Sequence, residues 1–371
     1  MTTLSQAGDA AEVVAGDLET ICDDLQSELP RLDGKHLLIT GGAGFLGYYL
    51  VQTVLHRNRN LDPPRRCQVT VYDNFSRGVP DWLLSPEGGE LHLVEHDVVR
   101  PLPDTLDHTD YIIHAASIAS PTYYREHPIE TMDANVIGFR RLLDYARAEG
   151  DAGRNLEGFL YFSTSEIYGD PDPASIPTSE GYRGNVSCTG PRACYDESKR
   201  YGETLCVNFA RQYGVPVTVA RPFNNYGPGL SIKDRRLLPD LAADVFANRD
   251  VVLLSDGQAT RTFCYIADAI CGYFRVLLRG RPAEAYNIGV EEPEVTVREF
   301  ADRVVAIARR DHNYQGSITG GISDDPEYLI DNPNRRCPVI NKAREELGYH
   351  PEVELDDGIA RTLTWYSGNR G

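Results

Sequence analysis

The run of residues from 36 to 57 restricts the fold of this chain more than any other segment. Residues 36–40 are predicted to be a buried strand, which leads into Gly41-Gly42-Ala43-Gly44-Phe45-Leu46-Gly47 and then into a helix over 45–57. The glycines at positions 41, 44 and 47 allow a tight turn, close approach of the backbone to a pyrophosphate, and close packing of helix on strand. A glycine-rich turn in this context predicts a dinucleotide-binding fold.

The next predicted strand, 68–72, ends in Asp73, which indicates the type of dinucleotide. A carboxylate at this position accepts hydrogen bonds from the adenosine ribose hydroxyls, which favours NAD over NADP. Arg77 is a candidate partner for a 2′-phosphate, but Asp73 would repel that phosphate. Asp97 is interpreted as a contact of the adenine amine, and ordinary turn chemistry explains it nearly as well. The predicted cofactor-binding set is Gly41, Gly44, Phe45, Leu46, Asp73, Asn74, Asp97, Val98, Ala116, Tyr195 and Lys199.

Apolar segments alternate with helical segments along most of the chain, which predicts an α/β fold with a Rossmann-like, doubly wound parallel sheet. The expected strands are 36–40, 68–72, 91–94, 111–115, 158–163 and 215–220, and the expected helices are 45–57, 128–149 and 196–213. After residue 223 the alternation breaks down. We therefore expect an NAD-binding Rossmann domain over 34–223 plus about 263–289, and a smaller C-terminal α/β substrate-binding lobe over 224–262 and 290–367.

Residues 1–33 form a separate N-terminal helical extension in this interpretation. Its apolar residues follow helical spacing, its opposite face is acidic, and Pro30 is expected to end the helix. We expect this helix to pack on its own domain or on a partner subunit, and we assign no chemistry to it. The apolar residues are Val14, Leu18, Ile21, Cys22, Leu25 and Leu29.

Composition and charge exclude several classes of function. The chain has 371 residues with 37 Lys and Arg against 55 Asp and Glu, and the resulting charge of −18 argues against nucleic-acid or anionic-membrane partners. An anionic substrate would therefore need a local arginine cluster. The eight cysteines lack metal-ligand spacing, so we expect reduced thiols and no metal site. With neither a membrane-length apolar run nor a signal-peptide pattern, a cytoplasmic protein is expected.

Tyr195 and Lys199 are the candidate acid/base pair. Four residues apart, they share one face of the predicted helix, where the ammonium is expected to stabilise the phenolate and lower the pKa of Tyr195. Such a phenolate accepts a proton from a sugar hydroxyl. The spacing alone is common on helices, and it gains weight from the run Ser163-Thr164-Ser165-Glu166 that precedes it in the sequence.

Four motifs together resemble the extended short-chain dehydrogenase/reductase superfamily, nucleotide-sugar branch. They are the glycine loop with Asp73, the Thr-Ser-Glu-Ile-Tyr-Gly run at 164–169, the Tyr195/Lys199 pair and the Arg-Pro-Phe-Asn segment at 221–224. Within this branch, Gly190-Pro-Arg-Ala-Cys-Tyr-Asp-Glu-Ser-Lys199 and Asn334-Arg335-Arg336-Cys337-Pro338 closely resemble the UDP-glucuronate decarboxylase family, also called UDP-xylose synthases. The resemblance covers about 34–365.

This resemblance implies an NAD-dependent enzyme that oxidises UDP-glucuronate at C4 and then releases carbon dioxide. The product is UDP-xylose, a released UDP-4-keto-pentose, or both. The implied catalytic residues are Thr164, Glu166, Tyr195, Lys199 and Arg336, with Arg336 orienting the C6 carboxylate. The implied substrate contacts are Tyr124, Ser165, Glu166, Asn224, Arg236, Arg261 and Arg336, of which Asn224 and Arg261 meet the diphosphate. Relatives are usually dimers joined through helices that correspond to 130–149 and 196–213, so a homodimer is expected.

Two other functions remain open from the sequence. A UDP-glucuronate 4-epimerase would return the electrons without loss of carbon dioxide, and a non-catalytic NAD-binding sensor would use the fold alone. A sugar-nucleotide 4,6-dehydratase is less favoured, because Ser165 stands where those enzymes carry the acid that protonates the leaving hydroxyl. The chain also departs from the decarboxylase pattern over 227–236 and at Cys337, which leaves the sugar and the product open.

Overall fold

The computed structural model describes residues 3–84, 89–103, 106–323 and 325–369, so residues 1–2 of the predicted extension and residue 324 of the predicted lobe lie outside it. In the described chain seven parallel strands form the central sheet, in the order β11-β6-β5-β4-β1-β2-β3. The predicted doubly wound sheet is therefore confirmed. Its strands are β1 (His36–Thr40), β2 (Gln68–Asp73), β3 (Leu91–Glu95), β4 (Tyr111–His114), β5 (Gly158–Phe162), β6 (Val217–Pro222) and β11 (Ala285–Ile288).

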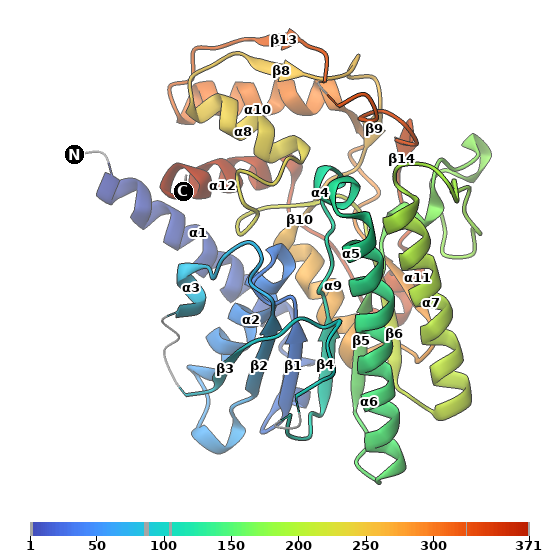
Figure 1. Cartoon of the computed structure of the whole chain (residues 1–371). Helices are drawn as coiled ribbons and strands as arrows, with labels where there is room; N and C mark the ends of the chain where they lie inside the picture. The colour runs from blue at the N-terminus through green and yellow to red at the C-terminus, as the bar shows by residue number, and fades with distance from the viewer. Residues whose placement is uncertain (1–2, 85–88, 104–105, 324, 370–371) are drawn as a thin grey trace.

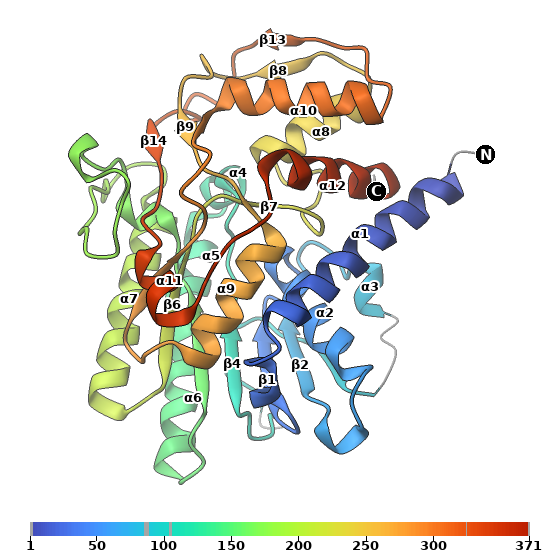
Figure 2. The same cartoon turned by 180° about the vertical axis from the view of Figure 1, so that it is seen from behind.

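Helices cover both faces of this sheet (Figures 1 and 2). One face carries α5 (Pro128–Asp133), α6 (Phe139–Asp151) and α7 (Ala193–Tyr213); the other carries α2 (Phe45–Asn58), α9 (Ile266–Arg279) and α11 (Asn341–Leu347). A π-helical turn, Ala134–Gly138, joins α5 to α6 and completes the helical segment expected over 128–149. In α6 the apolar residues recur at helical spacing and are buried, which explains why this segment packs on the sheet: Phe139, Leu142, Leu143 and Ala146.

The direction of the strand order reverses between β1 and β4. Thr40 at the end of β1 pairs with Tyr72 on one side and His114 on the other. Ligands of such sheets bind outside the carboxyl ends of the strands at this reversal. The glycine loop leaves the end of β1, Ala116 follows β4, and Thr164 follows β5, so the fold brings the predicted site residues to one edge of the sheet.

A second group of elements lies beyond that edge, at the top of Figure 1. It contains α8 (Leu237–Phe246), α10 (Val297–Asp311) and α12 (Leu355–Gly368), the strand pair β8 (Val251–Leu253) and β13 (Ile318–Gly320), and the strands β12 (Val295–Thr296), β9 (Thr260–Arg261) and β14 (Arg335–Arg336). Strand β9 pairs with β14 in parallel, with Arg261 opposite Arg336. A capping box of Thr296 and Glu299 begins α10.

Short elements connect the two groups. Strand β7 (Asn225–Tyr226) pairs with β10 (Cys264–Tyr265). Helix α11 packs on α9 and β11, although it lies within the segment predicted as the substrate-binding lobe. The division into an NAD-binding domain and this lobe stays a prediction. The remaining short helices are α3 (Asp81–Leu84), α4 (Pro121–Glu126) and the 3-10 turns Pro63–Arg65, Ser165–Tyr168 and Pro173–Ser175.

The N-terminal helix α1 (Thr3–Asp24) packs on α2, α9 and α12 of its own chain (Figure 2). Of the predicted apolar face, Cys22 is half-buried and the other residues are buried. The predicted end of the helix is wrong, because α1 ends at Asp24. Pro30 instead lies in a 3-10 turn, Leu29–Leu32, since a proline is tolerated in the first turn of a helix, where its missing N–H is not needed.

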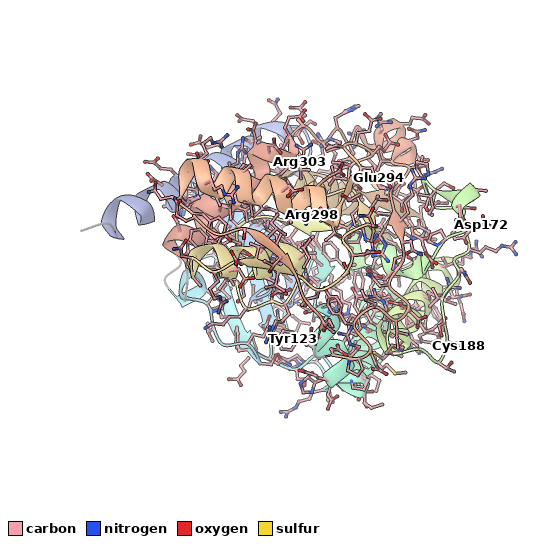
Figure 3. The ribbon with its side chains drawn as sticks, turned by 90° about the horizontal axis from the view of Figure 1, so that it is seen from above. Tyr123, Asp172, Cys188, Glu294, Arg298 and Arg303 are labelled. Atoms are coloured by element: carbon pink, nitrogen blue, oxygen red, sulfur yellow. The ribbon has the colours of Figure 1, made fainter. Side chains whose placement is uncertain are left out.

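The described residues were predicted to lack a membrane-spanning helix and a metal site and to carry reduced cysteines. None of their helices is both long and apolar enough to cross a membrane, and none of their His, Cys, Asp and Glu side chains form a group suited to a metal ion. All eight cysteines are free. Cys188 is exposed and lies at the edge of the molecule seen from above (Figure 3).

Candidate active site

The glycine loop has a backbone that only glycine accommodates at its first position. Gly41 has a φ of +75°, and a Cβ there would lie 2.5 Å from the Ala116 nitrogen. A Cβ at Gly47 would lie 2.3 Å from the Gly42 carbonyl oxygen, so the first turn of α2 packs directly on the loop. The glycines at 41 and 47 therefore have the roles predicted from the sequence.

Asp73 is anchored beside this loop. Its Oδ2 accepts a hydrogen bond from the Ala43 N–H at 3.0 Å, and its Oδ1 accepts one from the Phe75 N–H at 2.9 Å. Burial raises the pKa of Asp73, and the two backbone donors oppose that shift. Gly44 caps α2 without a side-chain hydrogen bond, which leaves first-turn N–H groups for an anion. These features fit the pyrophosphate and ribose of NAD.

The other predicted cofactor contacts lie around the same edge. Asp97 accepts a hydrogen bond from the Val99 N–H at 3.0 Å, as ordinary turn chemistry would require, and Val98 is buried. Asn74 makes a similar turn with the Ser76 N–H. Ser117, which the sequence analysis did not single out, also follows β4, and its hydroxyl is buried without a hydrogen-bond partner among the described residues. Phe45 and Leu46 pack on the core as partly buried residues.

The candidate acid/base residues meet at the start of α7. Tyr195 and Thr164 are both buried, and the Thr164 hydroxyl makes a hydrogen bond with Tyr195. Thr164 also caps the turn Ser165–Tyr168, where its oxygen accepts from the Glu166 N–H at 3.2 Å. Lys199 is buried, donates to the Phe162 carbonyl at 2.8 Å, and lies 5.8 Å from the centre of the Tyr195 ring. The fold thus brings together three residues predicted to act in one proton transfer.

The pKa values of this pair differ from the prediction. Burial raises the pKa of Tyr195 to about 12, and the hydrogen bond from Thr164 only partly opposes that rise. Burial also lowers the pKa of Lys199 to about 7. The predicted lowering of the Tyr195 pKa is therefore wrong for this structure, because burial disfavours the phenolate, the negative charges of Glu166 and Asp196 add to that effect, and only the Thr164 hydrogen bond and Arg236 oppose it.

A buried ion cluster lies beside Tyr195. Arg336 forms a bidentate pair with Glu166, with Nη1 bonded to Oε1 and Nη2 to Oε2 at 2.6 Å, and Arg192 also donates to Oε2. Arg192 and Arg336 each expose only 6% of their surface. Burial alone would raise the pKa of Glu166, but Arg192 and then Arg336 hold it at about 2. The arginine cluster that an anionic substrate would require is therefore present.

Arg261 adds a third buried cation. Its hydrogen bonds among the described residues go to neutral oxygens only: the carbonyls of Thr260, Pro333 and Asn334 and the side-chain amide of Asn332. Burial, reinforced by Arg336, lowers the pKa of Arg261 to about 9. A buried guanidinium held by neutral groups fits the predicted role as a diphosphate ligand.

The other predicted substrate contacts have separate positions. Asn224 has a φ of +39° and donates to the Thr262 carbonyl at 2.9 Å. Arg236 forms an ion pair with Asp234 at 2.9 Å and is close enough to Tyr195 to lower its pKa slightly. Ser165 is buried in the turn that carries Glu166.

Tyr124 stacks on the candidate base. The rings of Tyr124 and Tyr195 lie 5.0 Å apart with 6° between their planes, and the Tyr124 hydroxyl is buried without a hydrogen-bond partner among the described residues. The Arg192 guanidinium lies 5.9 Å from the centre of the Tyr124 ring. A buried hydroxyl that lacks a partner suits a contact with a sugar hydroxyl.

Two charged residues of the cluster were not predicted from the sequence. Arg192 and Asp196 flank Tyr195 within the motif at 190–199, and their charges lie 3.7 Å apart. Burial, reinforced by Glu166, raises the pKa of Asp196 to about 7. Their place in that motif was a signal available in the sequence.

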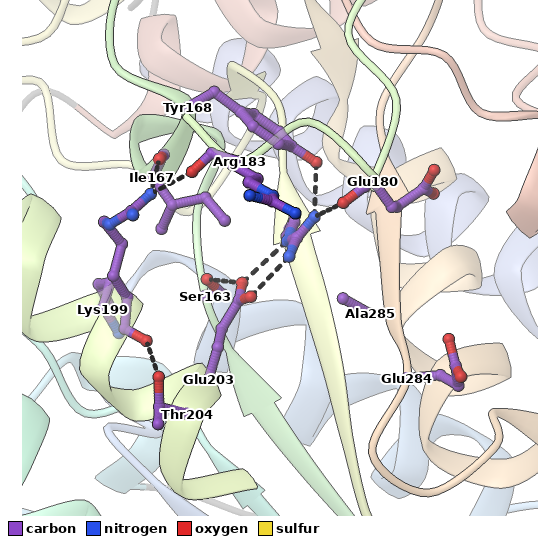
Figure 4. Close-up of polar contacts among 12 residues, drawn as sticks. Ser163, Ile167, Tyr168, Glu180, Arg183, Lys199, Glu203, Thr204, Glu284 and Ala285 are labelled. Carbon is purple, nitrogen blue, oxygen red and sulfur yellow. Dashed lines mark hydrogen bonds and ion pairs between the residues drawn. The ribbon is translucent and has the colours of Figure 1, made fainter. Parts of the chain in front are cut away.

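Glu203 on α7 joins three segments behind the site (Figure 4). Its Oε1 accepts hydrogen bonds from the Ser163 hydroxyl at 2.5 Å and from Arg221 Nε at 2.8 Å, and its Oε2 accepts from Arg221 Nη2 at 2.6 Å. Arg221 also donates to the Tyr168 hydroxyl at 2.8 Å. Because Ser163 precedes Thr164, this network fixes the end of β5 relative to the helix that carries the candidate base.

Comparison with known proteins identifies similar chains. Residues 37–289 match the model of the NAD dependent epimerase/dehydratase family. UDP-glucuronic acid decarboxylase 6 of Arabidopsis thaliana is 36% identical over 327 residues, which make up 87% of this chain and 86% of that protein. UDP-glucuronic acid decarboxylase 1 of Danio rerio is 36% identical over 345 residues, 91% of this chain and 74% of that protein.

Solved structures show the same fold. The dTDP-glucose 4,6-dehydratase DesIV from Streptomyces venezuelae, with NAD and TYD bound, is 28% identical with a TM-score of 0.76, and the match covers 90% of this chain and 98% of that one. The epimerase Mth375 from Methanothermobacter thermautotrophicus is 26% identical with a TM-score of 0.78, covering 95% and 96% of the two chains. The Rossmann-like fold and the NAD cofactor predicted from the sequence are both confirmed.

Proposed function

The chain belongs to the NAD-dependent epimerase/dehydratase family and, within it, to the UDP-glucuronic acid decarboxylases, and from this we propose that it converts UDP-glucuronate to a UDP-pentose with release of carbon dioxide. The observation that carries the proposal is the buried cluster of Glu166 with Arg192 and Arg336 beside Tyr195. An arginine pair in a buried site recognises a carboxylate on the substrate, and the carboxylate is the group that the reaction removes.

The proposed first step is oxidation of the sugar at C4. NAD, when bound, supplies the acceptor for the electron pair of this oxidation and returns the pair at the end of the cycle. Tyr195 takes the proton of the C4 hydroxyl in its phenolate form, which its raised pKa makes the minor form in the free site. Thr164 hydrogen-bonds the same hydroxyl and keeps it directed at the phenolic oxygen. Lys199 binds the nicotinamide ribose and, when protonated, supplies positive charge 5.8 Å from the centre of the Tyr195 ring.

The proposed second step is loss of the carboxylate. A ketone at C4 makes the C6 carboxylate a β-keto acid, so the bond between C5 and C6 breaks with the electrons delocalised onto the C4 oxygen. Arg336 orients the carboxylate, and Glu166 holds Arg336 ready in the free site. Proton transfer to C5 and reduction at C4 then give UDP-xylose, and release before reduction gives a UDP-4-keto-pentose.

The nucleotide end of the substrate is assigned to the other basic and polar groups. Arg261 and Asn224 bind the diphosphate, with Arg236 as a further contact. Tyr124 and Ser165 line the sugar site with Glu166. The neutral partners of Arg261 and the hydroxyl of Tyr124 that lacks a partner in the described chain support these assignments.

We also infer a cytoplasmic homodimer. Large apolar side chains are exposed on helices α5 and α7 and on the π-helical turn between α5 and α6, which are the helices expected to form a dimer: Ile129, Met132, Ile137, Tyr201 and Tyr213. Exposed apolar side chains on neighbouring helices favour burial in a subunit interface. Light scattering during size-exclusion chromatography measures the mass directly, and a monomer at micromolar concentration would contradict the dimer.

The proposed reaction is tested by incubating the purified protein with UDP-glucuronate labelled with ¹³C at C6. Release of labelled carbon dioxide, followed together with NADH absorbance and NMR of the nucleotide sugar, supports decarboxylation. Formation of UDP-galacturonate without carbon dioxide would identify the 4-epimerase instead. No change in the nucleotide sugar after addition of NAD would support the non-catalytic alternative. The same NMR spectra separate UDP-xylose from a UDP-4-keto-pentose.

A further inference from the structure

Arg336 is already paired in this structure. Its guanidinium makes two hydrogen bonds to the Glu166 carboxylate, and both side chains lie in a largely buried site. For Arg336 to bind the carboxylate of a substrate, it must loosen this bidentate pair. Breaking a buried pair leaves the remaining charge without compensation, which is strongly unfavourable. A second partner for Glu166 is therefore needed.

Arg192 is that second partner. It donates to Oε2 of Glu166, the same oxygen that accepts from Nη2 of Arg336. Arg192 precedes α7, whereas Arg336 lies on β14, so the two arginines reach Glu166 from different segments of the chain. Arg192 is also fixed from other directions, by the Asp196 carboxylate at 3.7 Å and by the ring of Tyr124 at 5.9 Å.

We propose that Arg192 is a positioning residue, which keeps Glu166 paired while Arg336 turns to the carboxylate of the substrate. The inference rests on the proposed function, because it needs a substrate that carries a carboxylate. With Arg192 present, Glu166 keeps a cationic partner when Arg336 turns to the substrate carboxylate. Without it, Glu166 and the substrate carboxylate would compete for Arg336 and repel each other.

The contact with Tyr124 also links Arg192 to the candidate base, Tyr195. Tyr124 stacks on Tyr195, so the guanidinium that holds Glu166 also contacts the ring that supports the base. Arg261 does not replace Arg192, because its hydrogen bonds in the described chain go to neutral groups beside the expected diphosphate. Among the described arginines, Arg192 is the one that contacts both Glu166 and the ring of Tyr124.

The test is ligand binding by calorimetry in a Tyr195→Phe background, which is expected to bind substrate without consuming it. Arg192→Met should weaken UDP-glucuronate binding by at least about 30-fold, because one partner of a buried charge pair is lost. UDP lacks the carboxylate, so its dissociation constant should change by less than about threefold. Arg192→Lys keeps the charge and should restore most of the affinity for UDP-glucuronate.

Arg335→Met is the matched control. Arg335 lies next to Arg336 on β14, but it is exposed and pairs with Glu294. The same substitution there should leave both dissociation constants unchanged. Equal weakening of UDP and UDP-glucuronate by Arg192→Met, or no weakening of either, would overturn the inference. If Arg192→Met does not fold, Arg192→Gln decides in its place, since it also removes the charge and must weaken the binding of UDP-glucuronate much more than that of UDP.

A double variant tests whether Arg192 acts through Glu166. In a Glu166→Gln background the charge of Glu166 no longer needs a cationic partner, so adding Arg192→Met should change UDP-glucuronate affinity by much less than it does in the single variant, about threefold or less. A loss as large as in the single variant would overturn the inference. If the otherwise unaltered protein releases no carbon dioxide and binds UDP-glucuronate no better than UDP, the proposed function itself fails. This outcome is distinct from failure of the inference about Arg192, which is read from the variants alone.

Discussion

Two carboxylates in this protein, the partly buried Glu166 and the buried Asp17, have opposite environments. Glu166, at the edge of the sheet, is paired with two arginines, and its pKa is held at about 2. Asp17 in α1 exposes only 1% of its surface and accepts hydrogen bonds from the hydroxyls of Tyr49 at 2.6 Å and Tyr265 at 2.7 Å and from Arg361 at 3.0 Å. Burial raises the pKa of Asp17, and these donors only partly oppose it.

The two carboxylates differ in how many arginines they bind and in which elements of the chain their partners come from. Asp17 binds one arginine and two neutral phenols, which belong to α2, β10 and α12, so it attaches the N-terminal helix to the rest of the chain. Glu166 binds two arginines, one of which, Arg192, also pairs with Asp196. A carboxylate with two cationic partners can keep one of them while the other binds a ligand, whereas Asp17 has a single cationic partner. The first arrangement suits recognition of an anion and the second suits stability.

Removing one phenol oxygen from the candidate site and one from the Asp17 cluster should affect different properties: the first should lower turnover and the second should lower stability. Tyr195→Phe should lower turnover by about 10³-fold or more while NAD and substrate still bind, because the proton acceptor is lost with little volume. Tyr265→Phe removes one hydrogen bond to Asp17, which should lower the free energy of unfolding by about 1 kcal/mol and leave turnover nearly unchanged. Steady-state kinetics and urea unfolding of both variants provide the measurements. Near-normal turnover of Tyr195→Phe would show that another group is the base.

Asp17→Ala should separate stability from catalysis. It leaves two buried hydroxyls and Arg361 without their shared acceptor, so we expect the free energy of unfolding to fall by about 2–4 kcal/mol. The activity of the folded protein should remain, because Asp17 does not contact the site. Urea denaturation followed by circular dichroism measures the first effect. A variant that unfolds normally but loses turnover would contradict the assignment of Asp17 to stability alone.

The two carboxylates should respond to pH with opposite signs. The folded-state pKa of Glu166 is lowered from 4.5 to about 2, so its stabilising contribution is present above pH 4.5 and is lost as the pH falls from there toward 2. The folded-state pKa of Asp17 is raised above 3.8, so its contribution is present below pH 3.8 and is lost as the pH rises through the raised value. Unfolding free energies of Glu166→Gln and Asp17→Asn, each compared with the unaltered protein across this range, should therefore diverge in opposite directions. Parallel pH profiles would contradict the comparison.

A salt bridge outside both clusters should have the smallest effect. Arg335 pairs with Glu294 at 2.7 Å, and Glu294 is labelled in the view from above (Figure 3). Because water screens exposed pairs, Arg335→Met should change the free energy of unfolding by less than about 1 kcal/mol and leave turnover unaltered. A larger loss of turnover would mean that the whole strand β14, and not the buried Arg336 alone, determines recognition of the carboxylate.

The sheet was predictable from sequence because its strands are short apolar runs between helices. Each of the six expected strands lies in the central sheet, with ends shifted by at most a few residues. The end of α1 was not predictable in this way. The apolar spacing continues through Leu29, and the pattern does not distinguish a helix from the 3-10 turn that buries the same side chains.

The candidate site was predictable only in part. Tyr195 and Lys199 share a helix face, so their proximity follows from local spacing. The bond between Glu166 and Arg336 joins residues 170 positions apart, and the raised pKa of Tyr195 depends on burial by several segments. Arg192 was visible in the motif, but its role depends on where Glu166 lies in the folded chain. The catalytic roles of these residues stay predictions.

Recognition of the substrate carboxylate by Arg336 is the central claim, and Arg336→Ala tests it most directly. Carbon dioxide release from UDP-glucuronate and calorimetric binding of UDP should be measured on the same preparation. We expect release to fall by about 10³-fold or more, since a charged hydrogen-bond contact and its contribution to the transition state are both lost, while UDP affinity changes by less than about threefold. If UDP binding and carbon dioxide release fall together, or if release is unaffected, Arg336 does not recognise the carboxylate.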